Sequence, residues 1–171
     1  MFTLTLEVGG TKALLVSINT LRTLDFTAFH DQAAQHMKGS VEKNYEAEQS
    51  PTGTPWRRHS PAYLLWLTRM GSPHPSGILN LSGAMKGSLD TASGPRQGRV
   101  FYRSGGYADR LHTPGVTTDV LAAIHTTGDS GRNLPRRPQM GFSSTRGDVA
   151  ELTAMLGRFV NQAVAQVSRA A

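Results

Sequence analysis

The residues of this chain that could do chemistry are a glycine-rich turn near the N-terminus, six histidines and a scattered set of carboxylates. Gly9-Gly10-Thr11-Lys12 follows a strand-like stretch, where backbone N–H groups could bind a phosphate. It lacks the G-x-x-x-x-G-K-S/T spacing of a phosphate loop, and its threonine precedes the lysine instead of following it. The sequence therefore favours a plain turn here over a nucleotide site.

The histidines show no metal-binding or catalytic spacing. They are His30, His36, His59, His74, His112 and His125. No H-E-x-x-H motif and no close His/Asp cluster occurs, so a metal site would need two histidines that only folding brings together. His125 ends an apolar run, and we expect its ring to be partly buried and bonded to the backbone.

Nucleophilic and carboxylate chemistry find no support in the pattern either. There is no G-x-S-x-G elbow, and the absence of cysteine excludes disulfides and thiolate sites. The acidic residues show no motif-like pairing, although two carboxylates could still meet in space, as in a small hydrolase. We expect a protein that is not an enzyme and that uses no metal or cofactor.

The charge indicates partners that carry negative charge. The 171-residue chain has 18 Lys and Arg against 12 Asp and Glu, a net charge of +6 with no run of five basic residues. Such a surface suits a DNA-lined channel, acidic protein neighbours or simple solubility. Trp56 and Trp66, near Arg57, Arg58 and Arg69, could stack single-stranded nucleic acid. We favour instead the interpretation that Trp66 lies in the core and that Trp56 packs against it and so holds its loop in place.

The hydrophobic pattern predicts the elements of the N-terminal half. Alternation over residues 2–8 predicts a strand, followed by a short helix capped by Thr11. A second helix opens near Asp25 and fades at Tyr45, and Gly39 within it favours a bend or an early end. After a loop over 49–61, Ser60 and Pro61 begin a helix that is apolar around much of its girth. We expect that helix to be buried in the domain or in a subunit contact.

The C-terminal half predicts a hairpin and a long final helix. A short apolar segment over 78–85 precedes strands Gly87–Ala92 and Arg99–Arg103, joined by a loop longer than the two-residue type. Thr118 caps a short helix, and residues 138–142 re-enter as an extended piece. Thr145, with Asp148 three residues on, resembles a capping box for an amphipathic helix of about 24 residues, about 36 Å long.

These elements define the fold class. We expect one α+β domain over 1–171, in which a small antiparallel sheet made by the hairpin packs against several helices, with the long amphipathic helix at the C-terminus. No apolar run approaches the roughly 20 residues that span a bilayer, and the N-terminus lacks the pattern of a signal peptide, so we expect no membrane partner.

Two motifs after the second helix have a recognisable form. Pro51-Thr-Gly53-Thr-Pro55-Trp56, followed by Ser60-Pro61, resembles P-x-G-x-P-W…S-P. The stretch Ile78-Leu79-Asn-Leu81-Ser82-Gly83-Ala-Met85-Lys-Gly-Ser88-Leu89 resembles I-L-x-x-S/T-G-x-L-x-x-S-I/L, which leads into the hairpin.

Two further motifs follow in order and complete the pattern. Ala122-Ala-Ile-His125-Thr-Thr-Gly128 resembles Y-A-A-I-H-x-x-G without its tyrosine, which Leu121 replaces. Arg137-Pro138-Gln-Met-Gly141-Phe142-Ser143 resembles R-P-x-x-G-x-S, with Gln139 where an apolar residue is more common. Over about residues 50–160 the chain thus resembles the phage virion morphogenesis (tail-completion) family of the Mu-like type, with an insertion at 105–121.

The resemblance implies a structural virion protein that completes the tail or joins tail to head in the neck of a tailed phage. It implies an oligomeric ring, commonly hexameric, that contacts the head-completion or connector proteins and the tail tube, with non-specific contact to packaged DNA. The protein would reside in the virion, and in the host cytoplasm during assembly. The alternative is a basic nucleic-acid-binding module. The structural or interface residues that the resemblance implies are Gly53, Pro55, Trp56, Leu81, Gly83, His125, Gly128, Arg137, Pro138 and Gly141.

Overall fold

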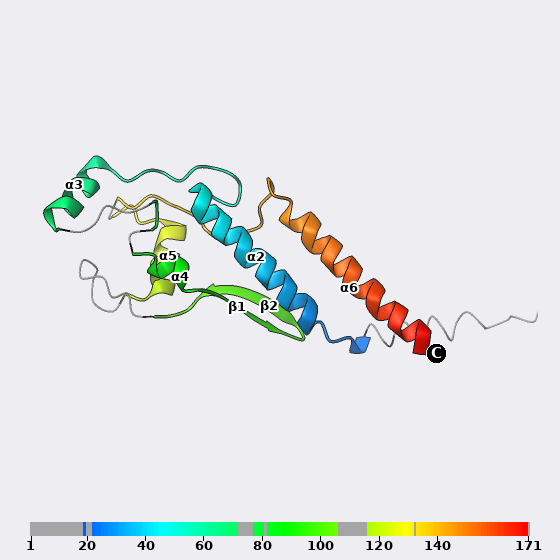
Figure 1. Ribbon diagram of the computed structural model, residues 1–171. Coiled ribbons are helices and arrows are strands. Elements are labelled where there is room, and N and C mark those ends of the chain that lie inside the picture. Colours follow the sequence, from blue (N-terminus) through cyan, green and yellow to red (C-terminus); the bar gives the residue numbers. More distant parts are fainter. Residues whose placement is uncertain are drawn as a thin grey trace, which may run out of the picture.

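The computed structural model describes residues 19, 22–71, 77–80, 82–105, 116–131 and 133–170, with the backbone alone for 167–170. The strand expected over 2–8 and the helix expected after Thr11 lie outside this part. The elements are α2 (Thr27–Ala47), α3 (Pro61–Arg69), α4 (Ala84–Gly87), β1 (Leu89–Gly94), β2 (Gln97–Tyr102), α5 (Thr118–Thr127) and α6 (Asp148–Ala170). Helices α2 and α6 lie side by side and antiparallel, the hairpin lies under α2, and α3 lies at the opposite end from the C-terminus (Figure 1). The α+β prediction is confirmed.

Helix α2 begins where the sequence predicts. The carboxylate of Asp25 accepts hydrogen bonds from the backbone N–H and the hydroxyl of Thr27, at 2.8 and 2.5 Å. The helix continues through Gly39 to Ala47, so Gly39 does not end it. One glycine costs about 1 kcal/mol in a helix, and burial of the α2 face that includes Val41 and Tyr45 offsets that cost.

The hairpin is tighter than the sequence indicates. Its register pairs Leu89 with Tyr102 and Gly94 with Gln97, which leaves a turn of two residues, 95 and 96. The prediction of a longer loop was wrong because Gly98 belongs to a strand. A Cβ on Gly98 would lie 2.5 Å from the backbone oxygen of His30, so the glycine lets α2 approach the strand closely.

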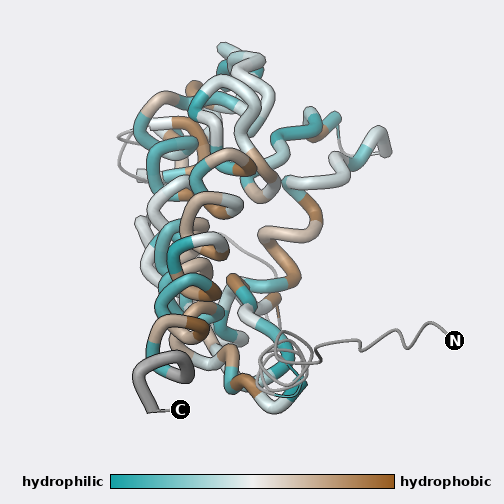
Figure 2. Tube along the Cα trace, turned by 90° about the vertical axis from the view of Figure 1, so that its right-hand side faces the viewer, coloured by the Kyte–Doolittle hydropathy of each residue, from teal (hydrophilic) through white to brown (hydrophobic). Residues whose placement is uncertain are grey.

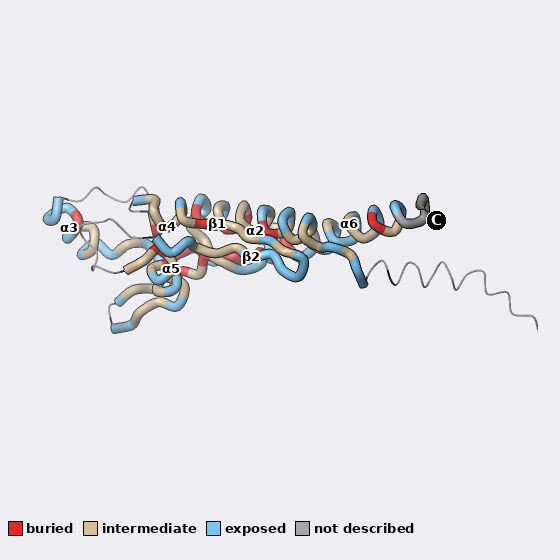
Figure 3. Tube along the Cα trace, turned by 90° about the horizontal axis from the view of Figure 1, so that it is seen from below, coloured by how far each residue is buried: buried red, intermediate tan, exposed pale blue. Residues whose placement is uncertain are grey.

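The core forms where α2 crosses the hairpin and meets α4 and α5 (Figure 3). Its buried residues are Val41, Tyr45, Trp56, Ile78, Leu79, Met85, Leu89 and Ala122. Tyr45 lies edge-on to Trp56, with ring centroids 5.6 Å apart. Its hydroxyl shares a hydrogen bond of 2.8 Å with that of Tyr102, and burial raises the pKa of Tyr102 to about 12. The core therefore joins α2, the loop after it and the hairpin.

Helix α3 starts as predicted but is not buried. The Ser60 hydroxyl accepts a hydrogen bond from the Tyr63 N–H at 3.2 Å, which caps the helix. Of its apolar residues only Leu67 is buried, whereas Leu65 and Trp66 are 52% and 41% exposed. The prediction of a core Trp66 was wrong because α3 extends beyond the α2–hairpin layer (Figure 3), and Trp56 occupies the core instead.

Two predicted helix caps differ from the structure. Helix α5 has Thr117 at its N-cap, and the hydroxyl of Thr118 donates instead to the backbone oxygen of Arg103. Helix α6 begins at Asp148 and not after Thr145, because Gly147, with φ of 68°, separates it from a preceding turn. The expected capping box is therefore absent from this end of α6.

Helix α6 is amphipathic along its 23 residues, with polar and apolar residues interspersed on the way to the C-terminus (Figure 2). Phe159 packs against Phe26 and Phe29 at the start of α2, with ring centroids 5.4 and 6.0 Å away. Among the described residues, no helix is both long and apolar enough to cross a membrane.

Candidate functional site

The family-like motifs come together in two chain segments that hydrogen-bond to each other. The indole N–H of Trp56 donates to the backbone oxygen of Pro138 at 3.1 Å. The buried guanidinium of Arg137 donates from Nε and Nη2 to the backbone oxygen of Arg57, at 3.1 and 2.8 Å. The Arg137 N–H donates to the backbone oxygen of His125 at 2.6 Å. The loop after α2 is thus fixed to the segment after α5.

Two glycines of the motifs sit where no side chain fits. Gly128 has φ of 75°, and a Cβ there would lie 3.0 Å from the Arg136 nitrogen. Gly141 has φ of 143°, and its Cβ would lie 3.1 Å from Cγ of Pro51. Positive φ and a close neighbour both favour glycine, so these two residues fix the path of the chain.

The remaining predicted residues are more dispersed. Gly53 and Gly83 have φ of 83° and 74°, at a turn and at the start of α4. Pro55 is exposed, and it forms an isolated bridge with Gln49. Leu81 lies outside the described residues.

A buried carboxylate joins α6 to α2. Asp148 accepts hydrogen bonds from the Ser143 N–H and from the Ser40 hydroxyl, each at 2.6 Å, and its other oxygen lies 3.3 Å from Nε2 of His36. Burial alone would raise the pKa of Asp148, but the hydrogen bonds from Ser40, Ser143 and His36 outweigh it and lower that pKa. The carboxylate is therefore charged and structural.

A second polar cluster continues this contact toward the core. Nη2 of Arg146 donates to the side-chain oxygen of Asn44 at 2.7 Å, and the Asn44 amide donates to the backbone oxygen of Gln139 at 2.8 Å. The fully buried Gln139 side chain accepts from the Thr126 hydroxyl at 2.7 Å. Sequence reasoning missed Ser40 and Asn44, because the pattern of α2 singled out only its apolar face.

A groove of about 570 Å³ lies between the start of α3 and helix α5. Apolar side chains from several segments form its walls: Pro61, Val116, Leu121, Ile124, Leu134 and Pro135. Its charged lining residues, among those described, are all basic: Arg57, Arg58 and Arg137.

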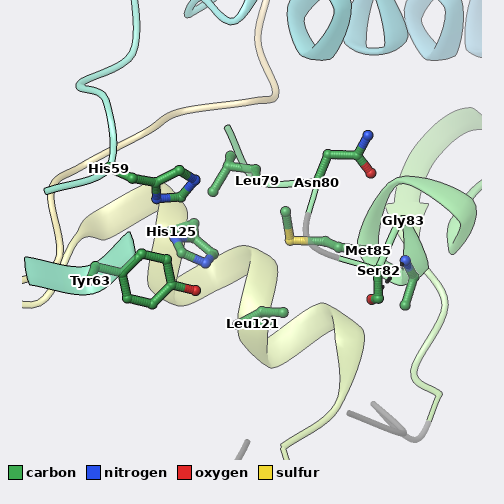
Figure 4. A pocket seen from close by; sticks show the side chains of 10 residues that line it. His59, Tyr63, Leu79, Asn80, Ser82, Gly83, Met85, Leu121 and His125 are labelled. Atoms are coloured by element: carbon green, nitrogen blue, oxygen red, sulfur yellow. Dashed lines mark hydrogen bonds between the residues drawn. The ribbon is translucent and has the colours of Figure 1, made fainter. Parts of the chain in front are cut away.

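His59, Tyr63 and His125 line both this groove and a smaller adjoining pocket, where their rings lie close together (Figure 4). The His59 and Tyr63 ring centroids are 5.1 Å apart. Burial and, after it, the charge of Arg137 lower the pKa of His59, so its ring is neutral near neutral pH. Nε2 of His59 is buried and has no hydrogen-bond partner among the described residues.

The model of the phage virion morphogenesis family matches residues 10–158. The chain belongs to this family. It is a virion-associated protein with a structural role in virion assembly, and the family is typically non-enzymatic. The match extends beyond the four motifs to include α2. No curated protein and no solved structure matches the chain.

Within this virion morphogenesis protein, the motif residues act chiefly as scaffold. Trp56, Gly128, Arg137, Pro138 and Gly141 fix the path of two loops. His125 is half-buried in the groove wall, with its backbone oxygen engaged by Arg137. Across the described ranges, no three His, Asp or Glu side chains gather as metal ligands, and the His59–His125 pair has no third.

Proposed function

We propose that this protein completes the tail or joins it to the head, as one subunit of a ring at the neck of a tailed phage particle. The observation that carries the proposal is the family match over most of the chain, together with apolar side chains exposed at two separate places. Large apolar side chains in solvent indicate a contact surface when they cluster.

The first surface is the α3 face, made of Leu65, Trp66 and Met70, with Met70 55% exposed. It lies at the end of the molecule opposite the C-terminus (Figure 1). Helix α3 has no extensive packing against other described helices or strands. An apolar helix face that the subunit itself leaves uncovered is suited to a neighbouring copy.

The second surface is the α6 shoulder, made of Phe142, Val149 and Leu156, of which Phe142 is 60% exposed. Phe142 borders a recess of about 320 Å³ between α2, β2 and α6, which is lined largely by apolar side chains. Those side chains include Ala33, Met37, Val100, Met140 and Leu152. The α3 face of one copy packs on the α6 shoulder of the next in this proposal.

A contact between two different surfaces is heterologous, and it closes into a ring when the rotation between copies permits. A specific interface of this kind buries about 1,200–2,000 Å² in total. The proposal therefore requires the loops around α3 and α6 to contribute besides the six apolar residues.

The test is electron microscopy of particles made by a phage in which this gene carries an early stop codon. Heads and tails that remain separate, or tails with an unfinished end, support the proposal. Intact, tailed and infectious particles made without this protein would contradict the proposal. Complementation in trans by the wild-type gene is the control for effects on neighbouring genes.

One observation favours nucleic-acid contact as the second candidate function. Residues 49–108 contain seven Lys or Arg and only one acidic residue, Asp90, so this stretch carries the whole net charge of +6. Arg96, Arg99 and Arg103 are exposed on the hairpin. Thr91 bonds to Gln35 of α2, so by strand alternation Arg99 and Arg103 lie on the face away from α2.

We propose that these hairpin arginines face packaged DNA in the channel of the ring. A stand-alone DNA-binding module would instead bind duplex DNA as a monomer, with an affinity that falls steeply with salt. Titrating the monomer with a duplex at two salt concentrations separates the two functions, since a ring subunit binds DNA weakly until it is assembled.

A further inference from the structure

We infer that the groove between α3 and α5 is a docking site for an acidic peptide segment, flanked by apolar residues, of a neighbouring virion protein. The inference deepens the proposed function by naming the chemistry of a partner. It is measured on the isolated protein, so its failure and the failure of the neck assignment are distinguishable.

The charges around the groove select an anion. Arg57 and Arg58 lie on its rim and are exposed, and Arg137 contributes a third positive charge from within. No acidic side chain lines the groove among the residues described. The Arg137 guanidinium already donates to the backbone oxygen of Arg57, whereas the side chains of Arg57 and Arg58 make no hydrogen bond or ion pair with another described residue. These two rim arginines are the groups that bind a carboxylate.

The walls of the groove select a peptide over a DNA backbone. Leu121, Ile124 and Leu134 offer apolar contact on one side, and Pro61 and Tyr63 offer it on the other. Phosphodiester and sugar make little use of such walls, whereas apolar side chains on either side of a carboxylate fill them. The groove has a volume of about 570 Å³, which is enough for a few side chains of a peptide but too small to hold a DNA duplex.

The acidic residues of this chain are largely engaged inside the subunit, which favours a partner of different sequence. Glu46 pairs with Lys86 at 3.7 Å, and Asp90 pairs with Arg103 at 3.4 Å. Glu151 lies 3.0 Å from Arg158, and Glu48 accepts from the Ile78 N–H at 2.7 Å. A second copy therefore brings few unoccupied carboxylates from its described part to the groove.

One residue that lines the groove, His59, carries an unsatisfied polar atom. Nε2 of His59 is buried and has no partner among the described residues, beside the rings of Tyr63 and His125 (Figure 4). A buried polar atom without a partner is destabilising, and a bound segment or an ordered water would give it one. The atom is thus a second, independent feature that points to an occupant.

The test uses the full-length chain and fluorescent nonapeptides with one central Glu among apolar residues, each matched by its Gln counterpart. We expect a subset of Glu peptides to bind, with the Gln counterparts about tenfold weaker, a difference of about 1.4 kcal/mol. Arg58→Glu should weaken binding by at least about tenfold, because it reverses a charge on the rim. Lys43→Glu is the matched control, since Lys43 is exposed on α2 and does not line the groove, and the peptide affinity of this variant should stay within about twofold of wild type.

Three results would overturn the inference. The first is a panel in which no Glu peptide binds better than its Gln counterpart. The second is an equal loss of peptide affinity in Arg58→Glu and Lys43→Glu, which would mean that diffuse positive charge, and not the groove, binds the peptide. The third is displacement of the bound peptide by a short DNA duplex whose binding shows the same Arg58→Glu loss. Equal thermal midpoints for both variants and wild type exclude unfolding as the cause.

Discussion

The carboxylate of Asp148 accepts a hydrogen bond of 2.6 Å from the hydroxyl of Ser40, across 108 residues of sequence. The same carboxylate oxygen accepts the Ser143 N–H, so one buried charge fixes the first residue of α6, the turn before it and the middle of α2. It takes the place of the local capping box that the sequence favours. The position of α6, and with it the α6 shoulder, depends on this contact.

Asp148→Asn should destabilise the fold by about 2 kcal/mol, because it removes a charged acceptor that holds two buried donors. Urea unfolding followed by circular dichroism measures the free energy of unfolding. The control is Glu151→Gln, which removes an exposed ion pair in the same turn and should cost less than about 1 kcal/mol. Equal losses in the two variants would contradict a structural role for the Asp148 contact.

The stability of the protein should fall in acid partly through Asp148. Its pKa is lower in the folded chain than in the unfolded chain, so the unfolded state binds a proton first as the pH falls. The stabilisation is complete above the unfolded pKa of about 3.9 and is lost as the pH falls through the folded pKa. The urea midpoint of wild type should therefore drop more steeply in acid than that of Asp148→Asn. Parallel curves would show that Asp148 does not titrate as described.

The two tryptophans should separate folding from assembly. Trp56→Ala removes a core residue that is 5% exposed and should cost about 3–5 kcal/mol. Trp66→Ala acts on a residue that is 41% exposed and should cost less than about 1 kcal/mol, yet it should weaken the contact between copies. Urea unfolding measures the loss of stability in both variants. Incorporation of each variant into particles measures its effect on the contact between copies.

The control for the α3 face is Val120→Ser, which changes an exposed apolar residue on α5 outside both proposed surfaces. It should leave stability and incorporation close to wild type. If Val120→Ser reduced incorporation as much as Trp66→Ala, the α3 face would have no special part in the ring.

Two glycines should respond oppositely to alanine. Gly128→Ala adds a Cβ at φ of 75°, 3.0 Å from a backbone nitrogen, and should destabilise the fold by about 1–3 kcal/mol. Gly157→Ala adds a Cβ within α6 that meets nothing within 4 Å and should stabilise the fold by about 0.5–1 kcal/mol. Thermal unfolding measures both. An unchanged thermal stability of Gly128→Ala would mean that the loop after α5 can shift to accommodate the added Cβ.

The elements that the sequence predicts correctly are those set by local signals. Asp25 before α2 and Ser60-Pro61 before α3 act within three residues, so the pattern alone places both helix starts. The hairpin and the long final helix follow from alternation and from the helical stripe. The family match covers the four motifs and confirms the resemblance that they carry.

The features that the sequence does not predict depend on partners far along the chain. The turn of the hairpin is tight because Gln97 and Gly98 pair within β2, where the missing side chain of Gly98 leaves room for the backbone of His30. The Asp148 contact joins residues of α2 and α6. The apolar sequence around Trp66 predicts a core residue. The side chain is exposed because α3 lies beyond the layer formed by α2 and the hairpin. The groove combines residues from three segments, and of the structural or interface residues that the resemblance implies, only His125 and Arg137 line it.

Electron cryomicroscopy of the neck of the mature particle tests the central claim most directly. We predict a closed ring of copies of this chain between head and tail, with the α3 face of each copy on the α6 shoulder of the next. A neck reconstruction that contains no density for this chain, or that shows it with both surfaces exposed to solvent, would contradict the account.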